Sequence, residues 1–150
     1  MRQSHWAAAV IGWVAAASCH AADLGGGEGW SLDTPDATLD RSSSAMVVQI
    51  GRANSAKVDQ QAQGSGVAIR QSGKNQAAQV QQSGKDLSVD IAQDGSGNAV
   101  NLTQTGRHTT ATVLQDGHDN RADVAQLGNG LRLVITQTGD GGRVRATQNP

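Results

Sequence analysis

The sequence contains no phenylalanine and no tyrosine, and its three tryptophans all lie before residue 31. Large aromatic side chains usually supply much of the buried area of a globular core. Their absence therefore excludes an ordinary core over most of the chain and predicts a thin interior of Ala, Val, Ile and Leu. The single cysteine, Cys19, excludes an internal disulfide. The formal net charge of −1 gives no electrostatic reason to expect a nucleic-acid partner.

Residues 1–22 have the pattern of a secretory signal peptide. A basic residue precedes an apolar run over 6–17, and small residues follow it. The run is too short to cross a bilayer as a helix, which needs about 20 residues. We expect cleavage after Ala21 or Ala22. The alternative is lipidation at Cys19, but the residue three places earlier is smaller than such signals usually carry, which favours soluble export.

Residues 23–42 form a separate segment, rich in glycine and acidic residues and containing Pro35. A segment of this composition does not bury enough apolar surface to offset its ordering entropy, so a flexible spacer is the simplest interpretation. The functional alternative is a recognition segment for export, with Leu24, Trp30 and Leu32 as its anchors.

From residue 49 onward, glutamine recurs every eleven residues without a slip. In eight of the nine intervals a glycine stands two residues after the glutamine, the exception being Ala62, and we interpret this glycine as a turn signal. Self-similarity at a fixed period indicates a solenoid. The ten glutamines are Gln49, Gln60, Gln71, Gln82, Gln93, Gln104, Gln115, Gln126, Gln137 and Gln148.

Apolar residues stand seven and nine places after each glutamine, for example Ala56 and Val58. Residues two apart share one face of a strand, and this inward set contains no charged residue and no histidine between 43 and 148. Eleven residues also fit about three helical turns. A glycine in every unit would cost a helix about 1 kcal/mol each, so the pattern predicts strands and an all-β fold.

Two eleven-residue units are expected to form one rung, because a second alternation has a period of 22. Ten strands then give a β-solenoid of five strand-turn-strand rungs, stacked in an amyloid-like manner about 4.8 Å apart. Residues 22 apart would form ladders in which a buried Gln or Asn bonds to the same residue above and below. A buried amide outside such a ladder would cost about 1–3 kcal/mol. The ladder residues are the ten glutamines together with Asn54, Asn98 and Asn120, and the repeats are 43–64, 65–86, 87–108, 109–130 and 131–150.

These residues resemble the curlin repeat, Ser-x5-Gln-x4-Asn-x5-Gln. Ser43, Gln49, Asn54 and Gln60 reproduce it, and four weaker copies follow. The resemblance implies a secreted subunit of curli, the functional amyloid fibres on Gram-negative cell surfaces that serve adhesion and the biofilm matrix. It also implies as partners the chain itself, other curlin subunits and the outer-membrane secretion and assembly proteins, whose pore would recognise residues 23–42.

The family has a major subunit, which builds the fibre, and a minor subunit, which nucleates it at the cell surface. The last repeat departs most from the pattern, because Gly142 replaces the ladder amide and three arginines enter the outer face. This departure favours the minor subunit over the major one. We expect the arginines to act as gatekeepers against self-stacking, with drift in a terminal repeat as the alternative. They are Arg132, Arg143 and Arg145.

Nothing in the repeats indicates an enzyme, a cofactor or a metal site. His108 and His118 fall on opposite edges of the predicted rung, and Asp94 and Asp116 do not recur as calcium-binding β-roll repeats require. The competing class is a monomeric secreted β-solenoid, such as an adhesin or an ice-binding protein. Such proteins need caps over their end rungs, and none is visible toward the C-terminus, which favours a fibre subunit.

Overall fold

The computed structural model describes residues 10–15 and 43–149. These residues form strands and turns, so the described part of the chain offers no helix long and apolar enough to span a membrane. Cys19 and the three expected export anchors, Leu24, Trp30 and Leu32, lie outside the described residues. The strands are β1 (Val10–Ala15), β2 (Ser44–Arg52), β3 (Ser55–Gln63), β4 (Gly66–Lys74), β5 (Ala77–Lys85), β6 (Ser88–Ser96), β7 (Ala99–Arg107), β8 (Thr110–His118), β9 (Arg121–Asn129), β10 (Arg132–Asp140) and β11 (Arg143–Gln148).

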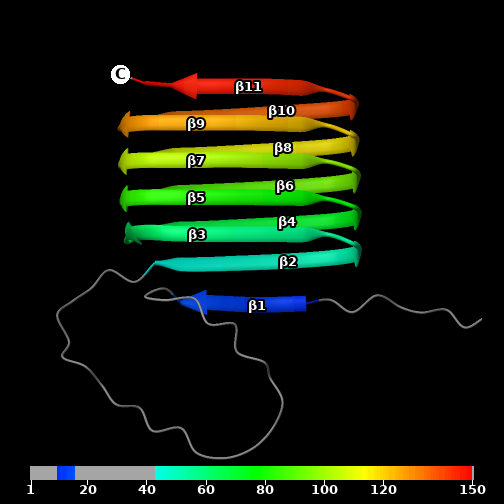
Figure 1. The fold of residues 1–150 in the computed structure, drawn as a ribbon, viewed down its shortest axis with the longest axis horizontal. Coiled ribbons are helices and arrows are strands. Elements are labelled where there is room, and N and C mark those ends of the chain that lie inside the picture. Colours follow the sequence, from blue (N-terminus) through cyan, green and yellow to red (C-terminus); the bar gives the residue numbers. More distant parts are fainter. Residues whose placement is uncertain (1–9, 16–42, 150) are drawn as a thin grey trace, which may run out of the picture.

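Successive strands from β2 onward alternate between two parallel sheets (Figure 1). Sheet A has the order β1-β2-β4-β6-β8-β10, and sheet B has the order β11-β9-β7-β5-β3. Each residue pairs with the one 22 positions further on, as Gln49 does with Gln71 and Gln60 with Gln82. Ten strands therefore form a β-solenoid of five rungs, and the predicted fold class is confirmed.

β1 is an addition to the ten predicted strands. It pairs antiparallel with β2, with Val10 opposite Gln49, whereas all strand pairs within the solenoid are parallel. The edge of β2 presents N–H and C=O groups that any extended segment satisfies by adding a strand. β1 covers only the sheet A half of this end, because β3 is the last strand of sheet B there.

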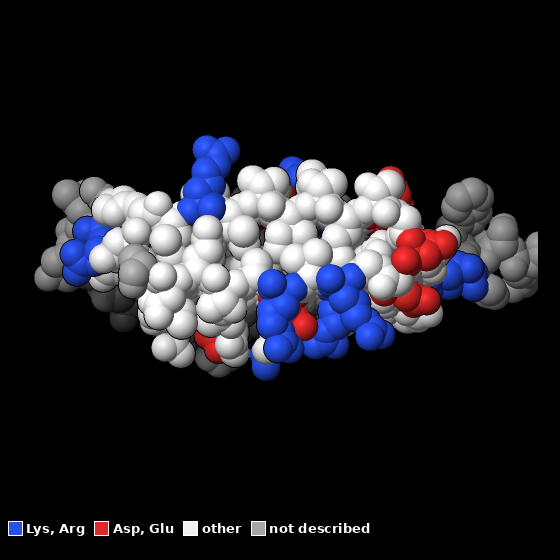
Figure 2. All heavy atoms as spheres, turned by 90° about the horizontal axis from the view of Figure 1, so that it is seen from above, with Lys and Arg blue, Asp and Glu red and all other residues white. Residues whose placement is uncertain are grey.

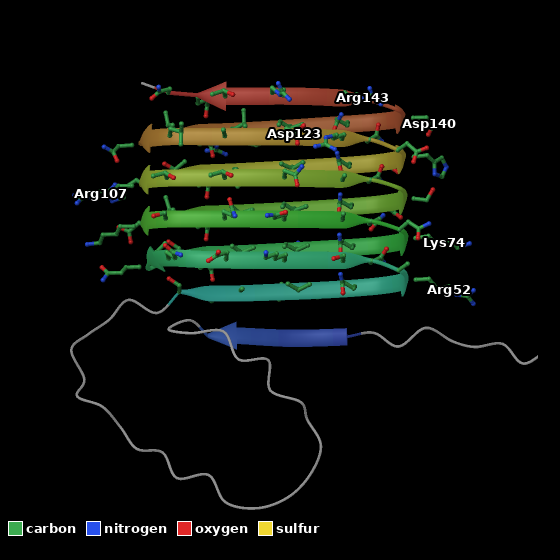
Figure 3. The ribbon with its side chains drawn as sticks, viewed as in Figure 1. Arg52, Lys74, Arg107, Asp123, Asp140 and Arg143 are labelled. Carbon is green, nitrogen blue, oxygen red and sulfur yellow. The ribbon has the colours of Figure 1, made fainter. Side chains whose placement is uncertain are left out.

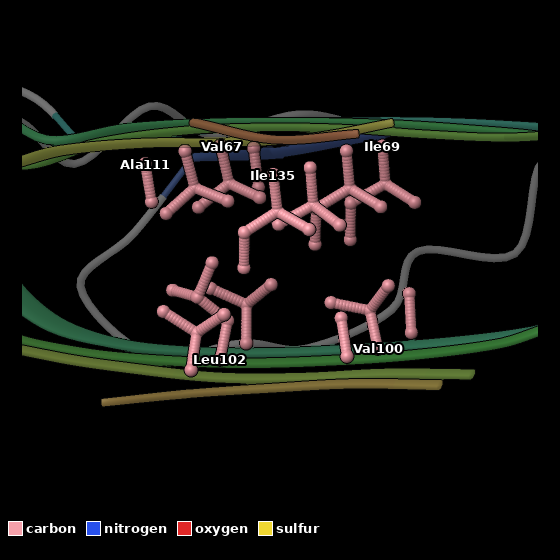
Figure 4. Close-up of a cluster of buried hydrophobic side chains, with 14 residues drawn as sticks. Val67, Ile69, Val100, Leu102, Ala111 and Ile135 are labelled. Carbon is pink, nitrogen blue, oxygen red and sulfur yellow. The ribbon is translucent and has the colours of Figure 1, made fainter. Parts of the chain in front are cut away.

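The core is a thin layer of small aliphatic side chains between the two sheets. Figure 4 shows Val67 and Ile69 of sheet A facing Val100 and Leu102 of sheet B, and all four are buried. The strands from β4 to β9 alternate between buried and more exposed residues with a period of two. Side chains of this size fill the narrow space between the sheets without aromatic rings, as the composition predicted.

The recurring glycine does not lie in the turn, which corrects the interpretation made from the sequence. It is the penultimate residue of its strand, with φ between +97° and +144°, and the chain turns two residues later at positions such as Asn75 and Asp119. At Gly117, an added Cβ would come far inside van der Waals contact with the carbonyl oxygen of Gly139 on the next rung. The close approach of two backbones therefore requires glycine here. The glycines at this penultimate strand position are Gly51, Gly73, Gly84, Gly95, Gly106, Gly117, Gly128 and Gly139.

Candidate functional site: amide ladders and end rungs

Two ladders of glutamine side chains run the length of the solenoid, one on each sheet. In each step, Nε2 of one glutamine donates to Oε1 of the glutamine on the next rung, with distances between 2.6 and 2.9 Å. The inner glutamines are buried, and Gln104 and Gln126 have no exposed surface. Charge-free amides stacked in this way satisfy one another in an interior that water does not reach.

The ladders have a direction. Gln49 and Gln60, at the N-terminal end, donate to the next rung, and no glutamine of the described residues lies before them to donate to their own Oε1. Gln137 and Gln148 accept from the previous rung, and their Nε2 groups donate only to backbone carbonyls, at 3.3 Å. One end of the solenoid therefore presents amide acceptors and the other presents amide donors.

The asparagines differ from the expectation that they, too, would pair amide to amide. Nδ2 of Asn98 donates to the carbonyl of Asp94 at 2.8 Å and to that of Gly117 at 3.0 Å. Its Oδ1 accepts the backbone N–H of Asn120 at 3.1 Å. The shorter side chain reaches the backbone beside the turn rather than the amide above it. The asparagine column therefore joins rungs through side chain and backbone together.

Two positions interrupt the asparagine column. At Gln76 the longer side chain still donates to Ser72 and Gly95, but its buried Oε1 has no hydrogen-bond partner among the described residues. At Gly142 the backbone N–H donates to Oδ1 of Asn120 at 2.8 Å, and no side chain is present to continue the column. The last rung thus presents one hydrogen-bonding group fewer than the rungs below it.

Charge on the outer face of sheet B gathers at the C-terminal end. Figure 2 looks down on the β10 and β11 end, and it shows Lys and Arg side chains grouped along the lower edge of the view, which is the outer face of sheet B. Arg143 stacks on Arg121, as expected from the sequence, and Arg145 stacks on Asp123. Asp123 also receives hydrogen bonds from Arg121, at 3.0 and 3.1 Å, and from Asn101, at 2.8 Å.

The carboxylate of Asp123 offsets part of the positive charge that the arginines bring to this face. Its hydrogen bonds to Arg121 and Asn101 hold the pKa of Asp123 below its usual value, and the same bond from Arg121 raises the pKa of that arginine. Both groups are therefore charged at neutral pH. Arg121, Arg143 and Arg145 lie around this one carboxylate, so the face keeps an excess of positive charge although Arg121 is paired.

The remaining candidate residues lie apart from one another. Arg132 starts β10 on sheet A, away from Arg143 and Arg145 on sheet B. His108 lies in the turn after β7, with Nε2 3.3 Å from a carboxylate oxygen of Asp86, whereas His118 ends β8. No three His, Cys, Asp or Glu side chains gather into a metal-binding group in the part of the chain that the structure describes.

Two overlapping stretches of the chain, residues 95–128 and 109–139, match the family model of the curlin associated repeat. They cover β7, β8 and β9 and most of β10, including Asn98 and Asn120 of the asparagine column. Comparisons with curated proteins and with solved structures give no match. The chain therefore carries the curlin associated repeat over residues 95–139, and the 22-residue register of the matched rungs continues through all five rungs.

Proposed function

We propose that the chain is a structural subunit of a curli-type extracellular fibre and that copies stack head to tail along the solenoid axis. The observation that carries this proposal is the direction of the glutamine ladders. Donors at Gln137 and Gln148 meet acceptors at Gln49 and Gln60 only when the C-terminal rung of one copy lies on the N-terminal rung of the next. Heterologous contacts of this kind do not close, so they produce fibres.

The backbone supports the same arrangement. β10 and β11 are the last strands of their sheets at the C-terminal end of the described chain. At the other end no strand of the described residues pairs with the outer edge of β3, and β1 occupies the edge of β2. The expected cleavage after Ala21 or Ala22 removes β1 from the mature chain. Uncovered parallel edges favour pairing with another copy. The competing function, a monomeric solenoid that binds a surface, requires both ends to be covered.

Gly139→Ala tests the fibre directly. Gly139 has no atom near the position of an added Cβ, whereas a Cβ at Gly117 would meet the carbonyl of Gly139. In a head-to-tail fibre, Gly51 of the next copy takes the same place over Gly139. We therefore expect a variant that folds but elongates at least about 10-fold more slowly, since removing such a clash requires the backbones to separate. Circular dichroism of the soluble chain from residue 23 on and thioflavin T kinetics without metal measure both effects.

Gly141→Ala is the matched control, because Gly141 lies in the adjoining turn with φ of +68° and also has open space around it. Ala53 and Asn75 occupy equivalent turn positions with φ of 55° and 54°, so a side chain is compatible with stacking there. This control should elongate at the parent rate. Elongation of Gly139→Ala at the parent rate would contradict head-to-tail stacking and favour the monomeric alternative.

We further propose that this chain is the minor, nucleating subunit rather than the major one. In a junction between identical copies, Arg145 faces Lys57 and Gly142 faces Asn54, by the same 22-residue step that pairs Arg143 with Arg121. Like charges opposite one another in a sheet are unfavourable, and Asn54 loses an acceptor for its backbone N–H. The last rung is thus a weaker template for this chain than an internal rung is.

The gatekeeper proposal predicts that a repaired last rung assembles faster. The variant Arg143→Ser, Arg145→Thr, Gly142→Asn removes the opposed charges and returns the missing amide. A Cβ at position 142 would lie 2.9 Å from Oδ1 of Asn120, the mobile end of a side chain, so a small shift accommodates it. We expect a lag time shorter by about 3- to 10-fold in unseeded assembly. A lag time equal to that of the parent would show that the charged rung does not hold back assembly.

The other parts of this proposal follow the family. Residues 23–42, with Leu24, Trp30 and Leu32, would direct the chain through the outer-membrane secretion pore to the cell surface. Other curlin subunits would be its partners in the fibre, and adhesion and biofilm formation would be the roles of that fibre. Repeat and fold are those of a structural protein, and the proposed role requires no catalytic residue and no cofactor.

A further inference from the structure

One edge of the solenoid carries a column of side chains whose charge changes sign along the axis. The stacked residues, at the last position of the sheet A strands, are Arg52, Lys74, Ser96, His118 and Asp140. Figure 3 shows Arg52 and Lys74 at one end of this edge and Asp140 at the other. The N-terminal end of the column is therefore basic, and its C-terminal end is acidic.

The last three residues of this column, Ser96, His118 and Asp140, are in contact with one another in sequence along the axis. Oγ of Ser96 lies 2.7 Å from Nδ1 of His118, and Oδ1 of Asp140 accepts the backbone N–H of His118 at 3.0 Å. On the opposite edge, one rung step brings Nε2 of His108 within 3.3 Å of Asp86. Side chains at the edges of adjacent rungs are therefore close enough to form hydrogen bonds and ion pairs with one another.

We infer that Asp140 of one copy and Arg52 of the next form an ion pair that holds the sheet A half of the fibre junction together. The inference rests on the proposed head-to-tail fibre, in which Arg52 of the following copy occupies the next step of the column. Oδ1 of Asp140 accepts the backbone N–H of His118, which holds the carboxylate at this edge, in the column that Arg52 of the following copy continues. The side chains at both ends are exposed, so the partner reaches them without rearrangement of the core.

Other charges lie near both ends of this edge. Lys74 lies on the rung next to Arg52, and Asp119 lies beside His118 in the turn below Asp140, whereas the cations Arg121 and Arg143 start the sheet B strands that follow these turns. The sheet B half of the same junction opposes Arg145 to Lys57. The attraction between Arg52 and Asp140 on sheet A therefore offsets the repulsion between Arg145 and Lys57 on sheet B. The first pair stabilises the junction, and the second destabilises it.

Charge reversal tests the pair, using chains from residue 23 on. Truncation there is justified because the whole core cluster and both glutamine ladders lie between residues 45 and 148. Elongation of each variant on seeds of the same variant is followed by thioflavin T at low salt. Arg52→Asp or Asp140→Arg alone should slow elongation by about 3- to 10-fold, because each places like charges opposite one another. The double variant, which restores the pair with reversed signs, should return to within about 2-fold of the parent.

Two controls separate charge at the junction from other effects. Arg107→Asp makes the same change of charge at the exposed end of β7, inside the solenoid and on the opposite edge, and should leave elongation within about 2-fold of the parent. Asp140→Asn keeps an oxygen for the N–H of His118 but removes the charge, and should slow elongation by about 2- to 3-fold. At 0.5 M NaCl the differences should largely disappear, since the screening length falls to about 4 Å.

The outcomes distinguish this inference from the proposed function. Single reversals that elongate like the parent, or a double variant no faster than the singles, would overturn the ion pair while leaving the fibre in place. A parent chain that does not elongate on its own seeds would instead overturn the head-to-tail fibre from which the inference starts.

Discussion

Replacing Gly117 by alanine is expected to abolish the folded solenoid. The residue has φ of +127°, and its new Cβ would run into the carbonyl oxygen of Gly139, which belongs to the backbone of the next rung. Relief of this clash requires β8 and β10 to separate, which breaks the parallel pairing between them. We expect a loss of at least about 4 kcal/mol in the free energy of unfolding, in the range found for the most damaging substitutions.

Gly139→Ala is the control for this effect, because it stands in the same column with φ of +97° and no rung above it in the same chain. Its free energy of unfolding should fall by only about 1–2 kcal/mol, which is the cost of a left-handed backbone conformation for an L-residue. Denaturant unfolding of the two soluble variants, followed by β-sheet circular dichroism, measures the difference. Equal unfolding midpoints would mean that backbone conformation alone, and not the close approach of rungs, requires these glycines.

The second large effect is expected at Gln82, and Gln81 is its matched control. Gln82 is 2 % exposed, accepts from Gln60 and donates to Gln104, both at 2.9 Å, whereas Gln81 points outward. Gln82→Ala leaves Oε1 of Gln104 without its donor and opens a cavity, and together these should cost about 3 kcal/mol. Gln81→Ala should change stability by less than about 0.5 kcal/mol.

Unfolding in urea and assembly kinetics of the two variants check this prediction. We expect the variant at Gln82 to unfold at lower urea and to assemble with a longer lag, because a damaged ladder disturbs the rungs on both sides. The volume-conserving Gln82→Met fills the cavity but still leaves Gln104 unpaired, so it should recover only part of the loss. Equal midpoints and lag times for Gln81→Ala and Gln82→Ala would refute the ladder as a source of stability.

Much of the fold follows from local rules that a sequence displays directly. Side chains in a strand alternate between two faces, so the spacing of Val67, Ile69 and Gln71 is enough to assign them to the interior. The unbroken eleven-residue register then predicts the number of strands and rungs and the pairing of residues 22 apart, and the structure confirms this fold. The strand β1 was not predicted, because its pairing partner is an edge that exists only after the rungs have formed.

The details of the candidate site depend on distances between rungs. Asn98 and Gln93 carry the same functional group, but the shorter side chain of Asn98 reaches backbone carbonyls while Gln93 reaches the next glutamine. Residue type gives the difference in side-chain length, but only the spacing between rungs shows which atoms each length reaches. The pairing of Arg121 with Asp123 is similar, since it requires two outward side chains on one strand to take compatible rotamers.

The sequence by itself determined the class of the fold, its period and the separation of inward amides and aliphatics from outward charges. Each of these depends on the alternating direction of neighbouring side chains, which is a local property of the chain. Only the tertiary structure decided why Gly117 must be glycine, which groups Asn98 bonds to, and that the carboxylate of Asp140 bonds to the backbone of His118. These depend on the spacing between stacked rungs, where backbones 22 residues apart come into contact and where side-chain length decides which atom is reached.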